Sequence, residues 1–242
     1  MLGFKNRNNK KAKAKAKLKR RLVTISNTRS FIAEQFRTIR TNIKYSAPDI
    51  DLKTILVTSS TIGEGKSTNV GNLGVVFAQE GKKVLIVDAD MRKPTMHYIF
   101  GVLNTVGLST VLARQNDINS VIQETPILGL HVLPSGRIPP NPAELLSSKR
   151  MEGIFDELKE LYDIVIFDSP PLLSVADAQI LSNKCDGTLL VIDTGAVERE
   201  DVIKATEILK SSHSKIMGTI LNNYNITKRQ KKNYLYYRTE LE

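Results

Sequence analysis

The sequence predicts an α/β fold in three layers, in which helices flank a mostly parallel central sheet. Two observations predict this class. Apolar runs alternate with helical patterns along most of the chain, and the runs are apolar at nearly every position, as in parallel strands that helices cover on both faces. The strands are expected near residues 53–58, 83–88, 129–134, 163–168, 187–193 and 215–221.

Ahead of the first strand, residues 31–45 (FIAEQFRTIRTNIKY) predict a helix with one apolar side that ends before Pro48. A chain of 242 residues with 41% hydrophobic content can build one sizeable core. We therefore expect a basic disordered tail over residues 1–28, a single domain over residues 29–222, and a polar, tyrosine-rich tail over residues 223–242.

The net charge of +10 is concentrated at the N-terminus. Residues 1–21 hold ten Lys or Arg residues and no acid, so the rest of the chain has 25 basic and 25 acidic residues. A balanced domain argues against a broad nucleic-acid-binding face, and we expect no nucleic-acid partner. For the tail itself three interpretations stay open: a solvated segment, contact with nucleic acid, or contact with anionic lipid, where each basic residue contributes about 1 kcal/mol.

A single cysteine, Cys185, excludes an internal disulfide framework and fits a reducing compartment. No run approaches the roughly 18 apolar residues that a membrane-spanning helix needs, and Leu22–Ile25 is too short for the apolar region of a signal peptide. We therefore expect a cytoplasmic protein that reaches a membrane only through a partner.

Residues 54–78 (TILVTSSTIGEGKSTNVGNLGVVFA) read as a buried strand, a loop of small residues and a helix that begins near Gly65. This is the context that a phosphate-binding loop requires, so the fold is predicted to be that of P-loop NTPases. Backbone amides and the helix N-terminus would hold the phosphates of ATP, Lys66 would reach the terminal phosphates, and Ser67 would ligate Mg²⁺. The predicted ATP-binding residues are Gly63, Glu64, Gly65, Lys66, Ser67 and Thr68.

The loop departs from the strict pattern, because Ser60 stands where a glycine is required five residues before Gly65. Hydroxyl side chains at Ser60 and Thr61 mark a deviant loop. The family must therefore be identified by other motifs.

Acidic residues end two further strands. Asp88 and Asp90 follow the strand in KKVLIVDADMRKP, and Asp168 ends the strand in YDIVIFDSPP. Parallel strands deliver such residues to the ligand crevice at one edge of the sheet. Each aspartate has a plain alternative role, which is to cap the helix of the following element.

Phosphoryl transfer needs positioning, charge neutralisation and a carboxylate that accepts the proton of the attacking hydroxyl. We assign Asp88 as general base and metal neighbour, Asp168 to the metal shell with Ser67, and Asp90 to metal or orienting support. Arg92 stabilises transferred charge or pairs with a carboxylate, and the sequence does not separate the two. The predicted catalytic residues are Lys66, Asp88, Asp90 and Arg92, and the predicted metal residues are Ser67, Asp88 and Asp168.

The motifs TSSTIGEGKST, VDADMRKP and FDSPP in this order resemble those of the bacterial tyrosine kinases of capsule and exopolysaccharide synthesis. The resemblance runs from about Ser30 to the C-terminus. It implies an ATP- and magnesium-dependent protein tyrosine kinase, with the catalytic aspartate in the second motif and the magnesium-associated acid in the third.

The resemblance also implies self-association. The family carries a Glu, Arg, Arg set that mediates contacts between subunits in a ring, and here the set falls on Glu34, Arg37 and Arg40. Residues three apart lie near one helix face and could present a charged edge. An ordinary solvated helix face with local ion pairs is the alternative.

The family ends in a tyrosine cluster that is phosphorylated in trans, which matches Tyr234, Tyr236 and Tyr237. A tyrosine hydroxyl has a pKa near 10 and needs a positioned base, which Asp88 would supply. The alternative is an aromatic tail that is used for docking. In the related fold the strand end ILN reads the adenine, so Asn222 is the candidate for that contact.

The family works with a transmembrane adaptor that activates the kinase, and this chain resembles the separately encoded form. The implied partners are therefore a ring of its own copies, the adaptor and other tyrosine-bearing proteins, at the inner face of the cell membrane. Partition or division-site ATPases share the sheet and the aspartates, but they carry a lysine early in the loop where this chain has Thr61. A nucleotide-gated scaffold without kinase activity is a third hypothesis.

Overall fold

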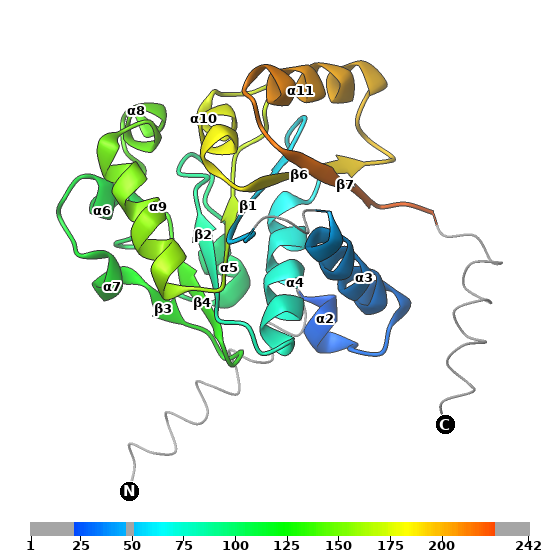
Figure 1. Ribbon diagram of the computed structural model, residues 1–242, viewed down its shortest axis with the longest axis horizontal. Coiled ribbons are helices and arrows are strands. Elements are labelled where there is room, and N and C mark those ends of the chain that lie inside the picture. Colours follow the sequence, from blue (N-terminus) through cyan, green and yellow to red (C-terminus); the bar gives the residue numbers. More distant parts are fainter. Residues whose placement is uncertain (1–21, 47–50, 226–242) are drawn as a thin grey trace, which may run out of the picture.

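The structure is a computed structural model that describes residues 22–46 and 51–225 (Figure 1). The predicted phosphoacceptors Tyr234, Tyr236 and Tyr237 and the basic residues 1–21 lie outside these ranges. The strands are β1 (Thr54–Ser59), β2 (Val84–Asp88), β3 (Gln123–Glu124), β4 (Leu130–Leu133), β5 (Ile164–Asp168), β6 (Gly187–Asp193) and β7 (Ile216–Asn222). The helices are α2 (Val23–Ser26), α3 (Phe31–Tyr45), α4 (Lys66–Gln79), α5 (Met96–Phe100), α6 (Leu108–Leu112), α7 (Ile118–Val121), α8 (Pro142–Leu146), α9 (Lys149–Leu161), α10 (Asp177–Lys184) and α11 (Arg199–Ser211).

The strands form one sheet in the order β3-β4-β2-β5-β1-β6-β7. Every neighbouring pair is parallel except β3 and β4, which are antiparallel. This topology confirms the predicted fold class. The six predicted strands are all present, with ends within one residue of those expected. The additional strand β3 was not predicted, because two residues are too short to show a strand pattern.

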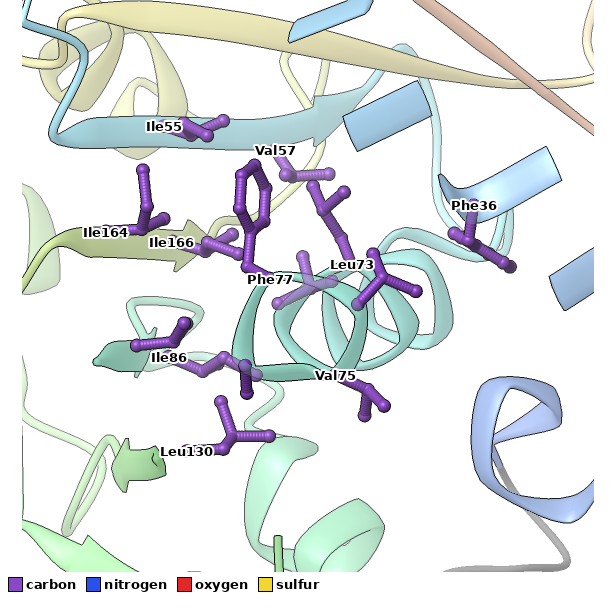
Figure 2. Packing of buried hydrophobic residues seen from close by; sticks show 14 of the residues in the cluster. Phe36, Ile55, Val57, Leu73, Val75, Phe77, Ile86, Leu130, Ile164 and Ile166 are labelled. Atoms are coloured by element: carbon purple, nitrogen blue, oxygen red, sulfur yellow. The ribbon is translucent and has the colours of Figure 1, made fainter. Parts of the chain in front are cut away.

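Side chains that alternate along the central strands build a core on each face of the sheet. On one face Ile55 and Val57 pack against Leu73 and Phe77 of α4, and α3 closes this side with Phe36 (Figure 2). On the other face a second cluster joins β1, β2 and β5 to α9 and α10. A third, smaller cluster joins β6 to α10 and α11. The sheet is therefore the middle of three layers, as the sequence predicts.

The predicted tail over residues 1–28 is corrected at its C-terminal end. Leu22 is fully buried in the core beside α4, and the Thr24 hydroxyl donates to Asn72 Oδ1 at 2.8 Å. The short helix α2 therefore packs on α4, and residues 22–28 belong to the folded body. The reason is that a helix of four residues, too short to form alone, is stabilised by tertiary burial.

Among the residues that the structure describes, no helix is both long and apolar enough to cross a bilayer.

We expect Leu22→Ala to destabilise the fold by about 2–5 kcal/mol, because it removes buried apolar atoms and leaves a cavity against α4. Urea unfolding followed by circular dichroism measures the change. Leu128→Ala is the matched control, since that side chain is 94% exposed and its truncation should cost little. Equal stability of the two variants would mean that α2 is not part of the cooperative unit.

Candidate active site

The loop between β1 and α4 has the geometry that phosphate binding needs. Gly63 and Gly65 have φ angles of 89° and 90°, which residues with a Cβ rarely adopt. Gly65 caps α4, whose first residues are Lys66, Ser67 and Thr68. The first N–H groups of a helix have no partner within it and carry positive potential. The predicted loop residues thus present amide donors at one helix end.

Two of the predicted aspartates lie side by side beneath this loop. Asp88 ends β2, Asp168 ends β5, and the two are direct partners in the parallel register. Both are fully buried. The Ser67 hydroxyl donates to Asp168 Oδ2 at 2.6 Å, which brings together the two residues predicted to share a metal shell.

Burial raises the pKa of Asp88 well above its usual value, and the charge of Asp168 raises it further. Backbone hydrogen bonds oppose the rise, since Oδ2 of Asp88 accepts the N–H groups of Thr95 at 3.0 Å and Met96 at 2.9 Å. Asp88 therefore also caps the start of α5, the alternative role that the sequence left open. Burial raises the pKa of Asp168 as well, against the lowering effects of the Ser67 hydrogen bond and the Lys66 charge.

The oxygen atoms at this site suit a magnesium ion. Oδ1 of Asp88 and Oδ1 of Asp168 are buried and have no hydrogen-bond partner among the described residues. Buried polar atoms normally have partners, and carboxylate and hydroxyl oxygens are the ligands that Mg²⁺ prefers. A cation beside Ser67 would compensate both carboxylates.

A cavity of about 580 Å³ opens over the loop. Its lining comprises Ile62, Gly63, Gly65, Lys66, Ser67, Thr68, Asp90, Arg92, Lys93, Thr95, Pro170, Pro171, Ser174 and Val175. Asp90 is therefore the predicted acid that faces the cavity, whereas Asp88 lies below its surface. The site groups the cationic side chains of the loop and of the β2–α5 segment around one hollow.

Of the two roles left open for Arg92, the structure shows the pairing with a carboxylate. Its guanidinium binds Asp177 with two hydrogen bonds, Nε to Oδ2 at 3.0 Å and Nη2 to Oδ1 at 3.1 Å. Asp177 is fully buried at the start of α10. Arg92 thus pairs with a carboxylate while it also lines the cavity. Sequence reasoning missed Asp177, because 85 positions separate the partners and no local pattern links them.

Asn222 lies against the loop rather than free of it. Its side-chain amide donates to the Glu64 carbonyl at 2.9 Å, and a Cβ added at Gly65 would lie 2.3 Å from that nitrogen. Asn222 therefore positions the loop, and its predicted contact with adenine stays a prediction. The Glu64 side chain is buried and is not among the residues that line the cavity.

The predicted interface residues do not form a single free edge. Arg37 Nη1 binds Glu34 Oε2 at 2.6 Å, the local ion pair that the sequence left open. Arg40 Nη1 donates to the Val76 carbonyl of α4 at 2.6 Å. Arg40 is thus held inside its own subunit, whereas the Glu34–Arg37 pair remains partly exposed.

The fold and the site together define a P-loop nucleotide-binding protein. A family model described as an AAA domain matches residues 52–228. The solved structure of the septum site-determining protein MinD complexed with Mg-ADP from Pyrococcus horikoshii OT3 is similar at a TM-score of 0.63, with 27% identity over 74% of this chain and 73% of that one.

Stronger similarity selects one branch of this class. The chain is 48% identical to the tyrosine-protein kinase YwqD of Bacillus subtilis, over 92% of this chain and 93% of that relative. The crystal structure of the chimerical protein CapA2B2 is similar at a TM-score of 0.82, with 41% identity over 85% of this chain and 90% of that one. The chain belongs to the bacterial tyrosine kinases of capsule and exopolysaccharide synthesis, a family of tyrosine-protein kinases.

We expect Asp88→Asn to stabilise the nucleotide-free protein. Because the folded-state pKa of Asp88 is raised, the folded wild type binds more protons than the unfolded chain and loses stability as the pH rises from about 4 through the raised pKa. Asparagine carries no charge and still accepts both backbone N–H groups. The gain in the free energy of unfolding should be larger at about pH 8 than at about pH 5. It should grow by about 1.4 kcal/mol for each pH unit, as long as the pH stays below the raised pKa.

Urea unfolding without nucleotide or magnesium at the two pH values measures this gain. Asp156→Asn makes the same chemical change on the exposed face of α9 and should show little pH-dependent difference. A gain from Asp88→Asn that shrinks with rising pH would contradict the raised pKa.

Proposed function

We propose that this kinase binds Mg-ATP at the β1–α4 loop and transfers the γ-phosphoryl group to tyrosines in the C-terminal tail of a neighbouring copy. The observation that carries the proposal is the meeting of a phosphate-binding loop with two buried strand-end carboxylates at one edge of the sheet. The family supplies the acceptor chemistry, and the similarity to YwqD, a tyrosine-protein kinase, supports tyrosine as the acceptor.

Binding is assigned to the loop. Its amide donors and Lys66 would hold the phosphates, while Ser67 and Asp168 would hold Mg²⁺. A bound magnesium ion would neutralise charge on the phosphate oxygens. The Mg-ADP complex of MinD supports this assignment, since that protein shares the fold.

The proton of the tyrosine hydroxyl is assigned to Asp88. As the tyrosine oxygen forms its bond to the γ-phosphorus, the bond to the ADP oxygen breaks and Asp88 Oδ1 accepts the hydroxyl proton. Once it is ionised beside a bound cation, a carboxylate with a raised pKa accepts a proton more readily than an ordinary aspartate does. Asp90 is the competing candidate, because it faces the cavity directly.

The predicted acceptors are Tyr234, Tyr236 and Tyr237. They follow the end of β7, whose last residue, Asn222, contacts the phosphate loop. The proposed biological setting is a membrane adaptor that activates the kinase and controls polysaccharide synthesis at the inner face of the cell membrane. The similar solved structure is that of a chimerical protein, CapA2B2, which supports a kinase that works with a second protein. The basic residues 1–21 would add contact with anionic lipid, which salt should weaken.

A trans-labelling experiment tests acceptor and base together. Full-length Asp88→Asn protein serves as acceptor, and a variant without residues 233–242 serves as donor, with labelled ATP and magnesium. We expect label on tyrosine of the full-length chain in the mixture and at least about 100-fold less with either protein alone. The full-length variant alone lacks the general base, whose loss costs about 10²–10⁴-fold. The donor alone lacks the predicted acceptor tyrosines.

The same assay separates the alternatives. Free phosphate without labelled protein would favour a partition-type ATPase, and ATP binding without either product would favour a scaffold. Full self-labelling of the truncated donor would reject the tail as acceptor. An Asp90→Asn variant that loses all activity, beside an Asp88→Asn variant that keeps it, would transfer the role of base to Asp90.

Assembly is proposed to use the Glu34–Arg37 pair of α3, because these side chains remain partly exposed while Arg40 is held by α4. We expect Arg37→Glu to shift the protein to smaller species in light scattering, since it places two like charges together. Arg199→Glu is the control, with the same charge reversal at an exposed helix start. Equal masses for wild type and Arg37→Glu would remove this pair from the interface.

A further inference from the structure

Glu64 is a buried carboxylate inside the phosphate loop, only 1% exposed. Its Oε1 accepts the backbone N–H of Thr61 at 2.6 Å and lies 3.3 Å from the Thr61 hydroxyl. Its Oε2 accepts the backbone N–H of Asp193, the last residue of β6, at 3.0 Å. One side chain therefore joins the start of the loop to the end of a neighbouring strand.

This placement is electrostatically unfavourable unless the carboxylate has a structural task. Burying a charge costs several kcal/mol, and a second anion near a triphosphate adds repulsion. Among the described residues, no lysine, arginine or histidine forms an ion pair with Glu64. The charge is instead compensated by hydrogen bonds from backbone amides, which are stronger to an ionised acceptor than to a neutral one.

The backbone of Glu64 is held as well. Its carbonyl accepts the Asn222 amide at the end of β7, and the same nitrogen would lie 2.3 Å from a Cβ on Gly65. Asp193 extends the connection, because its Oδ2 accepts the Asn223 side-chain amide at 2.7 Å. Asn223 has a φ angle of 54°, a left-handed conformation that this hydrogen bond helps to hold. Hydrogen bonds thus link the loop to the ends of β6 and β7.

We propose that Glu64 is a positioning residue for nucleotide binding, whose carboxylate fixes the shape of the phosphate loop and holds it against the end of β6. With Thr61 N–H bound to Glu64, the loop keeps the curvature in which Gly63 and Gly65 have positive φ angles and line the cavity. Without the carboxylate, the amides of Thr61 and Asp193 lose their acceptor and the loop loses this shape. The inference rests on the proposed nucleotide site, and it concerns binding rather than phosphoryl transfer.

Glu64→Gln tests the role of the charge at nearly constant shape. Glutamine can accept only one of the two N–H groups and turns its own N–H toward the other. We expect the affinity for Mg-ADP to fall about tenfold or more, and the KM for ATP to rise by a similar factor with a smaller change in kcat. Calorimetry with Mg-ADP and thermal unfolding with and without Mg-ADP are the measurements.

Glu152→Gln is the matched control, because Glu152 lies on α9 and binds Lys184 at the surface. Glu64→Asp is the second variant: it keeps the charge but is one methylene too short to reach both amides, and it should also weaken Mg-ADP binding. If Glu64→Gln fails to fold, Glu64→Asp decides. Wild-type affinity in a folded Glu64 variant would overturn the proposal, whatever the kinase assay shows, since Mg-ADP binding needs no acceptor.

Discussion

Two carboxylates, Asp88 and Asp168, lie side by side in a fully buried position where β2 and β5 end, and the rest of the site depends on this pair. Burial raises both pKa values, so the pair resists carrying two charges without a nearby cation. Lys66, at the start of α4, supplies one positive charge. A magnesium ion bound beside Ser67 would supply more, and it would give a partner to the two Oδ1 atoms that have none among the described residues.

The scaffold holds that pair with little freedom to move. Its two strands are central in the sheet and are packed on both faces, with Ile86 and Ile166 toward α4 and Val87 and Phe167 toward α9. Phe155 stacks on Phe167 at 4.7 Å between ring centroids. Apolar packing on both faces of the sheet thus offsets the cost of the buried charges. The loops at the carboxyl ends of the strands carry the chemistry.

At one position the loop of this chain differs from the pattern expected of the partition and division ATPases that share its fold. That expected pattern has a lysine where this chain has Thr61. Here the backbone at Thr61 is bound by Glu64, a residue of the same loop, so the position is occupied by an internal contact. Position 61 therefore offers no lysine to the phosphates of a dimer partner, which agrees with assignment to the tyrosine kinases.

The sequence alone determined the fold class, because near-continuous apolar runs can only be buried in a sheet covered on both faces. It also located the phosphate loop and the strand-end aspartates, since both are local patterns.

The tertiary structure decided what each side chain contacts. Asp88 caps α5, and Arg92 binds the distant Asp177. The same limit applies to Arg40, which donates to α4 although its spacing with Glu34 and Arg37 suggested one shared edge. It applies to α2 as well, whose order comes from burial of Leu22 in the core. These outcomes depend on which residues far apart in the chain compete for the same hydrogen-bond acceptor or the same buried space. Periodicity and motif spacing describe only neighbours along the chain, so such competition is settled when the layers pack.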